Sequence, residues 1–336
     1  MGTRWHGVLV ALGLLLGDSG GAWAAAGDLP PLSEADKNTT VRIWAGGVGW
    51  DHGMPYMAAE LGIWEKYGLK VDFKFGNPPL AVQVTQTGQF EASYMHNMQV
   101  LTFNDKGVPA VVGAATSMGS AAVIVSPTIN SAEDLKGKKY GVITKFDGMH
   151  VLFQEHILPA HGVKPDEMIA VQVPFTEAAL TLKRGDIAAY FMWEPIATQA
   201  ATEGGVKILW DWKETWNNGE FFRNCLVLNK TFVKERPALA KRVVWAHLDG
   251  LNFIRRNPER ATDIMTKWSK ITARKWFEVS LKKTDFSRDI IPDSWFDAME
   301  KDLKKLGLVS PDYRWQSGVD FSLHQGYVYR PGPKEQ

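Results

Sequence analysis

The chain has a single cysteine, Cys225, among its 336 residues. One thiol can form neither a disulfide nor a thiolate metal site within one chain, so neither stabilises this fold. The sequence also lacks a P-loop, a dinucleotide-binding glycine fingerprint and a nucleophile elbow, so no such motif points to an enzyme class. Its net charge is only +1, and near-neutrality argues against nucleic acid or an anionic membrane surface as a partner.

Long hydrophobic runs are equally scarce. The run at the N-terminus, Val8–Leu16, has nine residues, whereas a membrane-spanning helix needs about 20. It follows Arg4 and precedes small residues, a pattern that predicts a signal peptide over residues 1–26 with cleavage near Ala24–Ala26. No cysteine lies near that site, which excludes lipid attachment there. Export leaves about 310 residues, enough for two domains of ordinary size.

What the chain does contain is a repeated phrase. Gly185–Ile196 predicts a turn, a buried strand and a polar break before Pro195, a residue suited to the first turn of a helix. Gly88–Met98 precedes it by 97 residues and matches it at three of eleven positions, and a helical pattern precedes each copy. The junction of such a strand with its helix lies at the carboxyl end of a sheet, where open α/β sheets bind ligands. Two such halves predict an α/β protein of two lobes with a cleft between them.

The remaining segments divide between these lobes. We predict that lobe 1 comprises residues 41–126 and 229–330, that lobe 2 comprises residues 127–228, and that the chain crosses over near 126–130 and 221–229. The apolar segment Cys225–Leu228 is then a strand of lobe 2. From Glu235 to Leu308 amphipathic patterns predict a helical C-terminal segment that packs back onto lobe 1.

Six stretches of the chain carry a family resemblance. They lie within residues 41–270 and read GGVGW…PYMAAELGIWEKYGL, TGQFEASYM, SAEDLKGKKYGV, KRGDIAAYFMWEPI, LNKTFVKERP and RRNPERATDIM. Together they resemble the periplasmic substrate-binding proteins of ABC importers in the nitrate, sulfonate and taurine group, nearest to the taurine-binding members and with thiamine-pyrimidine-binding relatives. The resemblance implies a type II periplasmic-binding-protein-like fold with two crossover strands, which closes on a small molecule without metal or cofactor. It also implies a periplasmic monomer whose partners are a membrane permease and its ATPase.

The loops at the predicted cleft provide the candidate ligand contacts. Several helices are expected to begin at these loops, and helix N-termini favour anions through unpaired N–H donors and the helix dipole. A sulfonate or carboxylate could be held there without a basic cluster, and Lys145 is better interpreted as a solvated turn lysine. The candidates are Trp50, His52, Asn77, His96, Asn97, Ser117, Phe146, Asp147, Trp193, Glu194 and Trp216.

Several of these residues have a second interpretation. The resemblance places Trp193 at a ligand loop, whereas Trp50 fits ligand contact and interface packing equally well. Trp216 belongs to a tryptophan-rich loop. One ring of this loop is expected to cover the cleft, and the others are expected to pack within lobe 2. Glu194 either caps the helix that follows it or supplies a counter-charge for a ligand ammonium.

Three histidines, His52, His96 and His150, fall on different cleft loops. None has the local spacing of a metal-ligand motif, so we expect neutral hydrogen bonding or surface exposure and no metal site. The first ligand class is a sulfonate or related small anion, including an amino-sulfonate. A planar heteroaromatic such as a thiamine-precursor pyrimidine is the alternative, which tryptophan faces would suit. The alternative of another class is a periplasmic enzyme, although the cysteine-rich motif of the thiamine-pyrimidine synthase in this fold group is absent.

Overall fold

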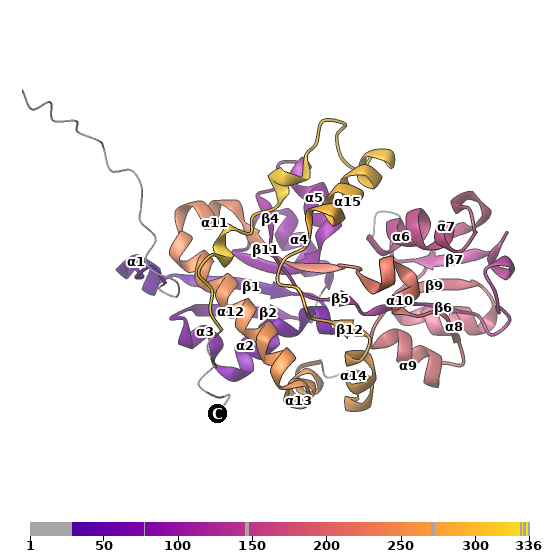
Figure 1. Cartoon of the computed structure of the whole chain (residues 1–336), viewed down its shortest axis with the longest axis horizontal. Helices are drawn as coiled ribbons and strands as arrows, with labels where there is room; N and C mark the ends of the chain where they lie inside the picture. The colour runs from indigo at the N-terminus through magenta and orange to yellow at the C-terminus, as the bar shows by residue number, and fades with distance from the viewer. Residues whose placement is uncertain are drawn as a thin grey trace, which may run out of the picture.

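The computed structural model describes residues 29–76, 78–144, 148–269, 273–329, 331 and 334. Two five-stranded sheets form the centres of two lobes, which lie side by side in Figure 1. The first sheet has the order β2 (Lys70–Phe75), β1 (Thr40–Ala45), β3 (Ala92–His96), β11 (Asn224–Asn229) and β4 (Ala110–Ala115). The second has the order β10 (Lys207–Trp210), β6 (Ala121–Val125), β9 (Ala189–Trp193), β7 (Lys139–Val142) and β8 (Ile169–Gln172). The predicted α/β fold of two lobes is confirmed.

The two sheets share one topology. In each, a central strand (β1 or β7) pairs in parallel with two neighbours, and one antiparallel strand (β11 or β6) follows. The repeated phrase occupies equivalent places, because β3 and β9 begin and end 97 residues apart (189 − 92 and 193 − 96). The duplication predicted from three matching positions is therefore present in the fold.

The predicted division of the strands is wrong at both crossovers. β6, assigned above to lobe 1, pairs with β9 and β10 in the second sheet, and β11, assigned above largely to lobe 2, pairs with β3 and β4 in the first. Every residue of both strands is buried, so their apolar patterns fit either sheet and only long-range pairing decides. The chain consequently crosses between the lobes at 116–120 and 211–223.

A third segment joins the crossovers. β5 (Met118–Gly119), in the first crossover, pairs with β12 (Thr284–Asp285), and Met118 also bridges to Phe222 of the second crossover. Gly119 has a φ of +69°, and a Cβ there would lie 2.6 Å from the ring of Trp212, so only glycine fits the turn and its packing.

Helices cover both faces of each sheet. Those of lobe 1 and the C-terminal segment are α1 (Glu34–Lys37), α2 (Gly53–Leu61), α3 (Ile63–Lys66), α4 (Pro78–Gln86), α5 (Asn97–Asp105), α11 (Lys230–Glu235), α12 (Pro237–Arg256), α13 (Pro258–Ser269), α14 (Arg274–Leu281) and α15 (Asp293–Lys305). Those of lobe 2 are α6 (Gly148–Leu152), a π-helical turn (Phe153–Ile157), α7 (Leu158–Ala160), α8 (Ala178–Arg184), α9 (Ile196–Glu203) and α10 (Trp212–Thr215). In the described part of the chain, no helix has the length and apolar character that crossing a membrane requires.

Of the C-terminal helices, α12 and α13 pack on lobe 1 as predicted, whereas α14 and α15 contact both lobes. The apolar stripe of α12 is buried against α2, where a Cβ on Gly250 would lie 2.6 Å from the carbonyl oxygen of Met54. On the opposite face of the first sheet, the apolar core continues without a break from Val100 through Trp295 to Phe153 and Phe191 of lobe 2. The two lobes therefore share buried apolar surface in this conformation.

Candidate functional site

The carboxyl ends of the central strands of the two lobes face each other. The loop after β1 (46–52) and the start of α5 belong to lobe 1, and the start of α6 and the loop after β9 belong to lobe 2. A Cβ on Gly148, at the first residue of α6, would lie 3.1 Å from Nδ1 of His96. A Cβ on Gly49 would lie 3.0 Å from the carbonyl oxygen of Glu194. The lobes thus touch at the loops in which ligand contacts were predicted.

A group of polar side chains lies at this junction. We define the polar cluster as Asp51, His52, His96, Arg223 and Asn224. Asn224 Nδ2 donates to Asp51 Oδ2 at 2.7 Å and to His52 Nε2 at 2.8 Å, and Arg223 forms an ion pair with Asp51. His96 lies opposite Asn224 in the pairing of β3 with β11. The side chains of the polar cluster are therefore positioned by β3, by β11 and by the loop after β1.

Four members of the polar cluster are almost completely buried, yet each keeps an unsatisfied atom. Asp51, His52, Arg223 and Asn224 are at most 7% exposed. Asp51 Oδ1, His52 Nδ1, Arg223 Nε and Asn224 Oδ1 make no hydrogen bond within the described part of the chain. Because His52 Nε2 accepts from Asn224, the neutral ring carries its proton on Nδ1, which is then a donor. Buried polar atoms normally have partners, so two donors and two acceptors here mark a site that another molecule can complete.

The charges in the polar cluster nearly cancel. Burial, together with the nearby positive charge of Arg223, lowers the pKa of His52 to about 4 and that of His96 to about 3. Burial opposes ionisation of Asp51, but the adjacent positive charge of Arg223 and the hydrogen bond from its guanidinium group lower the pKa of the Asp51 carboxyl group. At neutral pH the cluster therefore contains one cation, one anion and two neutral imidazoles.

Arg223 connects the lobes, and no sequence pattern predicted this role. Its guanidinium carbon lies 5.2 Å from the ring centroid of Trp193, whose ring also packs against Phe175 at 5.0 Å. Asp51 in lobe 1 and Trp193 in lobe 2 thus contact the same side chain. Arg223 lies in the second crossover, immediately before β11, outside every motif that carried the resemblance.

Space beside Trp193 is small in this conformation. A cavity of about 10 Å³ is lined by Trp193, His150, Met149 and residues of β7 and β9. That is room for roughly one water molecule. This cavity lies within lobe 2, and no residue of the polar cluster lines it.

The other predicted contacts are distributed more widely. Trp50 is completely buried in lobe 1, where its Nε1 donates to the carbonyl oxygen of Phe277 at 3.2 Å and to Ser280 Oγ at 3.0 Å. Trp50 therefore packs within the protein, and its ring has no exposed surface that a ligand could contact. Asn97 is also buried, and its Nδ2 donates to the carbonyl oxygen of Phe222 at 2.7 Å, which fastens α5 to the second crossover. Ser117 is buried in the first crossover.

The geometry of Glu194 matches the interpretation in which its side chain caps the helix that follows it. Its carboxylate is fully buried and accepts from the backbone N of Thr198 at 3.0 Å and from Thr198 Oγ1 at 2.8 Å. An ammonium does face it, but the ammonium belongs to Lys283 of the same chain, with Nζ 3.2 Å from Oε1. The partner expected on a ligand is thus supplied internally.

Trp216 lies apart from the polar cluster. Its ring contacts His156 and Trp295, with ring centroids 3.8 and 4.9 Å away, and these three line a separate groove of about 430 Å³. Asn77, Lys145, Phe146 and Asp147 lie outside the described residues, as does the predicted signal peptide. The structure therefore brings His52, His96 and Trp193 together with Asp51, and it adds Arg223 and Asn224. Among the described residues, no three His, Cys, Asp or Glu side chains are placed to hold a metal ion.

Comparisons with known proteins agree with this architecture. A Brucella abortus (strain 2308) protein described as a binding protein is 28% identical over 252 residues, 72% of this chain and 75% of that protein. The taurine-binding periplasmic protein of Escherichia coli (strain K12) is 26% identical over 197 residues, 57% of this chain and 60% of that protein.

Solved structures show the same fold at lower sequence identity. The ligand-binding component of an ABC-type import system from Staphylococcus aureus superposes with a TM-score of 0.76 at 15% identity, covering 87% of this chain and 100% of that one. The periplasmic aliphatic sulphonate-binding protein SsuA of Escherichia coli superposes with a TM-score of 0.69 at 15% identity, covering 88% and 95%. Residues 50–261, more than half of the chain and including most of the site, match the NMT1/THI5-like family, and the chain belongs to this family of periplasmic-binding-protein-like fold.

Proposed function

We propose that this protein is the periplasmic solute receptor of an ABC importer and that it captures its solute at the polar cluster between the lobes. The observation that carries the proposal is the set of unsatisfied buried atoms on Asp51, His52, Arg223 and Asn224. A solute that reached them would be held by groups from lobe 1 and from the second crossover, and would contact Trp193 of lobe 2. Delivery then involves a membrane permease and its ATPase.

The first candidate solute is a small organic anion of the sulfonate class, including a taurine-like amino-sulfonate. Arg223 Nε and His52 Nδ1 are two unsatisfied donors, and a sulfonate presents three acceptor oxygens. Asp51 Oδ1 is an unsatisfied acceptor close to them, which would suit the ammonium of a zwitterion. The taurine-binding relative and the sulphonate-binding structural neighbour support this class.

A planar heteroaromatic solute, such as a thiamine-precursor pyrimidine, is the second candidate. It is favoured by the ring of Trp193, beside which a flat solute could stack, and by the neutral imidazoles of His52 and His96. Both candidates describe a receptor and no catalyst. The one thiol, Cys225, is fully buried, and burial raises the pKa of its sulfur, so it is poorly suited to be a nucleophile.

A thermal-shift and calorimetry screen tests the proposal. The panel contains taurine, alkanesulfonates, nitrate, amino acids and aminopyrimidines, and each hit is then incubated with the protein and examined for product by mass spectrometry. A solute at 100 times its dissociation constant adds about 2.7 kcal/mol to the apparent stability. We expect a sulfonate to stabilise the protein and to be recovered unchanged.

Two arginine variants locate the binding. Arg223→Gln should abolish the shift, whereas Arg42→Gln should preserve it, because Arg42 lies on β1 and pairs with Glu91 at the surface. Circular dichroism confirms that each variant is folded, and Arg223→Lys keeps the charge if the glutamine variant unfolds. If the Arg223 variants bind the solute as tightly as the wild-type protein does, the solute does not bind at the polar cluster. Turnover of a hit would favour the alternative that the protein is an enzyme.

A further inference from the structure

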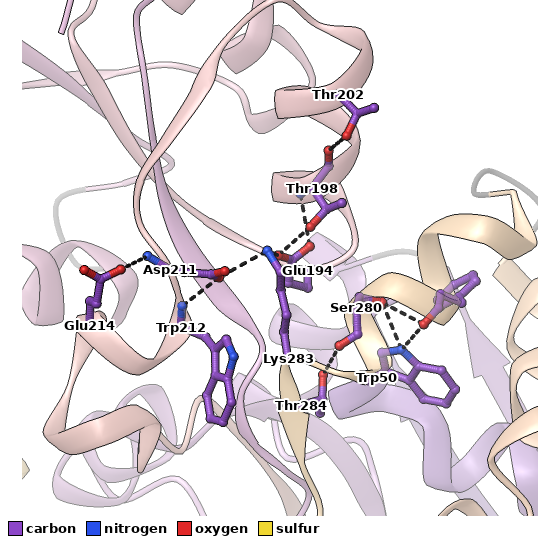
Figure 2. Close-up of polar contacts among 11 residues, drawn as sticks. Trp50, Glu194, Thr198, Thr202, Asp211, Trp212, Glu214, Ser280, Lys283 and Thr284 are labelled. Atoms are coloured by element: carbon purple, nitrogen blue, oxygen red, sulfur yellow. Dashed lines mark hydrogen bonds and ion pairs between the residues drawn. The ribbon is translucent and has the colours of Figure 1, made fainter. Parts of the chain in front are cut away.

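One short segment contacts both of the loops that flank the polar cluster. We call residues 277–284, the end of α14 and the beginning of β12, the brace. At one end of the brace, the carbonyl oxygen of Phe277 and Ser280 Oγ accept hydrogen bonds from Trp50 Nε1, in the loop after β1. Figure 2 shows Trp50 on one side of this segment and Glu194, in the loop after β9, on the other.

Lys283 forms the other end of the brace. Its Nζ lies 3.2 Å from Glu194 Oε1 and 3.1 Å from Asp211 Oδ1, and its side chain is 16% exposed. Its backbone is held as well, because its carbonyl oxygen accepts from the backbone N of Ser120, whose own carbonyl oxygen accepts from the backbone N of Glu194. Lys283 is therefore fixed beside the end of β9, where Trp193 lies.

Glu194 depends on this ammonium. Its carboxylate is fully buried, and the two hydrogen bonds from Thr198 carry no formal charge. Burying a carboxylate is costly unless it is paired and hydrogen-bonded, and Lys283 is the cation that faces Glu194 at this position. Glu194 directly follows Trp193, so a displaced Glu194 would displace Trp193 as well.

The ion pair with Asp211 also connects Lys283 to the second crossover. The Asp211 carboxylate accepts from the backbone N of Trp212 and caps α10, at the beginning of the second crossover. That crossover continues to Arg223. One ammonium thus contacts the segments that lead to both Trp193 and Arg223.

We propose that Lys283 is a positioning residue for solute binding, and that the brace fixes the lobe 2 ligand loop relative to the lobe 1 ligand loop. This inference rests on the proposed receptor function and deepens it. Lys283 does not touch the solute; it holds Trp193 and Arg223 in the arrangement that binds it. Trp50, completely buried, serves the same purpose at the other end of the brace.

Coupling between the two loops can be measured without any solute. Hydrogen–deuterium exchange of the ligand-free protein reports on the peptides that cover residues 46–53 and 190–198. Lys283→Met keeps the length of the side chain and removes its charge, so it should speed exchange at 190–198 and also at 46–53, which it does not contact. Trp50→Phe removes the N–H that donates to the brace, together with part of the buried ring, and should loosen 190–198 in return, because coupling between two sites is reciprocal.

A matched control comes from the same helix. Lys275 of α14 also forms an ion pair with lobe 2, at 2.9 Å from Glu203, but both side chains are about half exposed. An exposed pair contributes little, so Lys275→Met should leave both peptides unchanged. Lys283→Arg restores the charge and should restore slow exchange. Should Lys283→Met fail to fold, Asp211→Asn and Trp50→Phe test the same coupling.

The solute experiment then separates this inference from the proposed function. With a hit from the screen, Lys283→Met should weaken affinity about tenfold, mainly through faster dissociation, and Lys283→Arg should recover most of the loss. Two results would contradict the proposed coupling through the brace: faster exchange confined to 190–198 in Lys283→Met, or an affinity of Lys283→Met equal to that of Lys275→Met. Absence of any hit with the wild-type protein would instead overturn the proposed function, while the exchange results would still stand.

Discussion

Acidification should weaken this fold through His247, a fully buried residue of α12. Its Nε2 lies 2.8 Å from the carbonyl oxygen of Ala115, so this nitrogen carries the proton and donates. Its Nδ1 lies 3.0 Å from the hydroxyl of Tyr94, which donates to it. The neutral ring thus satisfies both nitrogens, and no carboxylate hydrogen-bonds to the ring in the described structure.

The size of the effect follows from the pKa. Burial lowers the pKa of His247 from 6.5 to about 4, partly opposed by the hydrogen bond to Ala115. Between pH 6.5 and about 4 the unfolded chain binds a proton at this residue and the folded chain does not, so the free energy of unfolding decreases as the pH falls. The difference between 6.5 and about 4, at roughly 1.4 kcal/mol per pH unit, corresponds to a loss of about 3.5 kcal/mol.

Urea unfolding of the wild-type protein and of His247→Gln between pH 7.5 and 4.5 tests this value. Glutamine keeps a donor for Ala115 but does not titrate, so we expect the variant to be less stable at pH 7.5 and to lose less stability on acidification. Leu251→Val is the control, because it is buried on the same helix and carries no charge. Its curve should run parallel to that of the wild-type protein. A parallel curve for His247→Gln would refute the assignment of a depressed pKa to this histidine.

Three further predictions concern the tryptophans and the movement of the lobes. Trp50→Ala should lower the free energy of unfolding by about 3–5 kcal/mol, measured by urea denaturation, because it removes a completely buried ring. Trp193→Ala should weaken solute binding in calorimetry with a smaller loss of stability, because its ring is only half-buried; a large melting loss with normal affinity would contradict a ligand role. Closure about the crossovers at 116–120 and 211–223 should reduce the radius of gyration in small-angle scattering when solute is added. An unchanged radius at saturation would count against a hinge motion.

Much of the fold could be predicted from local patterns. The repeated phrase placed β3 and β9 in equivalent positions, since a turn, an apolar strand and a helix start are properties of neighbouring residues. The amphipathic stripe of α12 likewise predicted which face is buried. The two lobes, and the face of each at which ligand loops gather, followed from these elements.

Sheet membership at the crossovers could not be predicted in this way. β6 and β11 consist of buried residues only, so their patterns do not distinguish one sheet from the other. Their partners are far away in the chain, β9 for the first and β3 for the second. Pairing at such separation depends on how the whole chain folds and leaves no local signal.

The sequence by itself determined that this is an α/β protein of two similar lobes with polar and aromatic loops between them, because hydrophobic periodicity and turn residues act locally. Tertiary structure alone decided which of those loop residues meet. It brought Arg223 between Asp51 and Trp193, and it brought Lys283 to Glu194, 89 residues away (283 − 194). A buried charge needs a partner in space and not in sequence, and for that reason the ammonium expected from a ligand at Glu194 is provided by the chain itself.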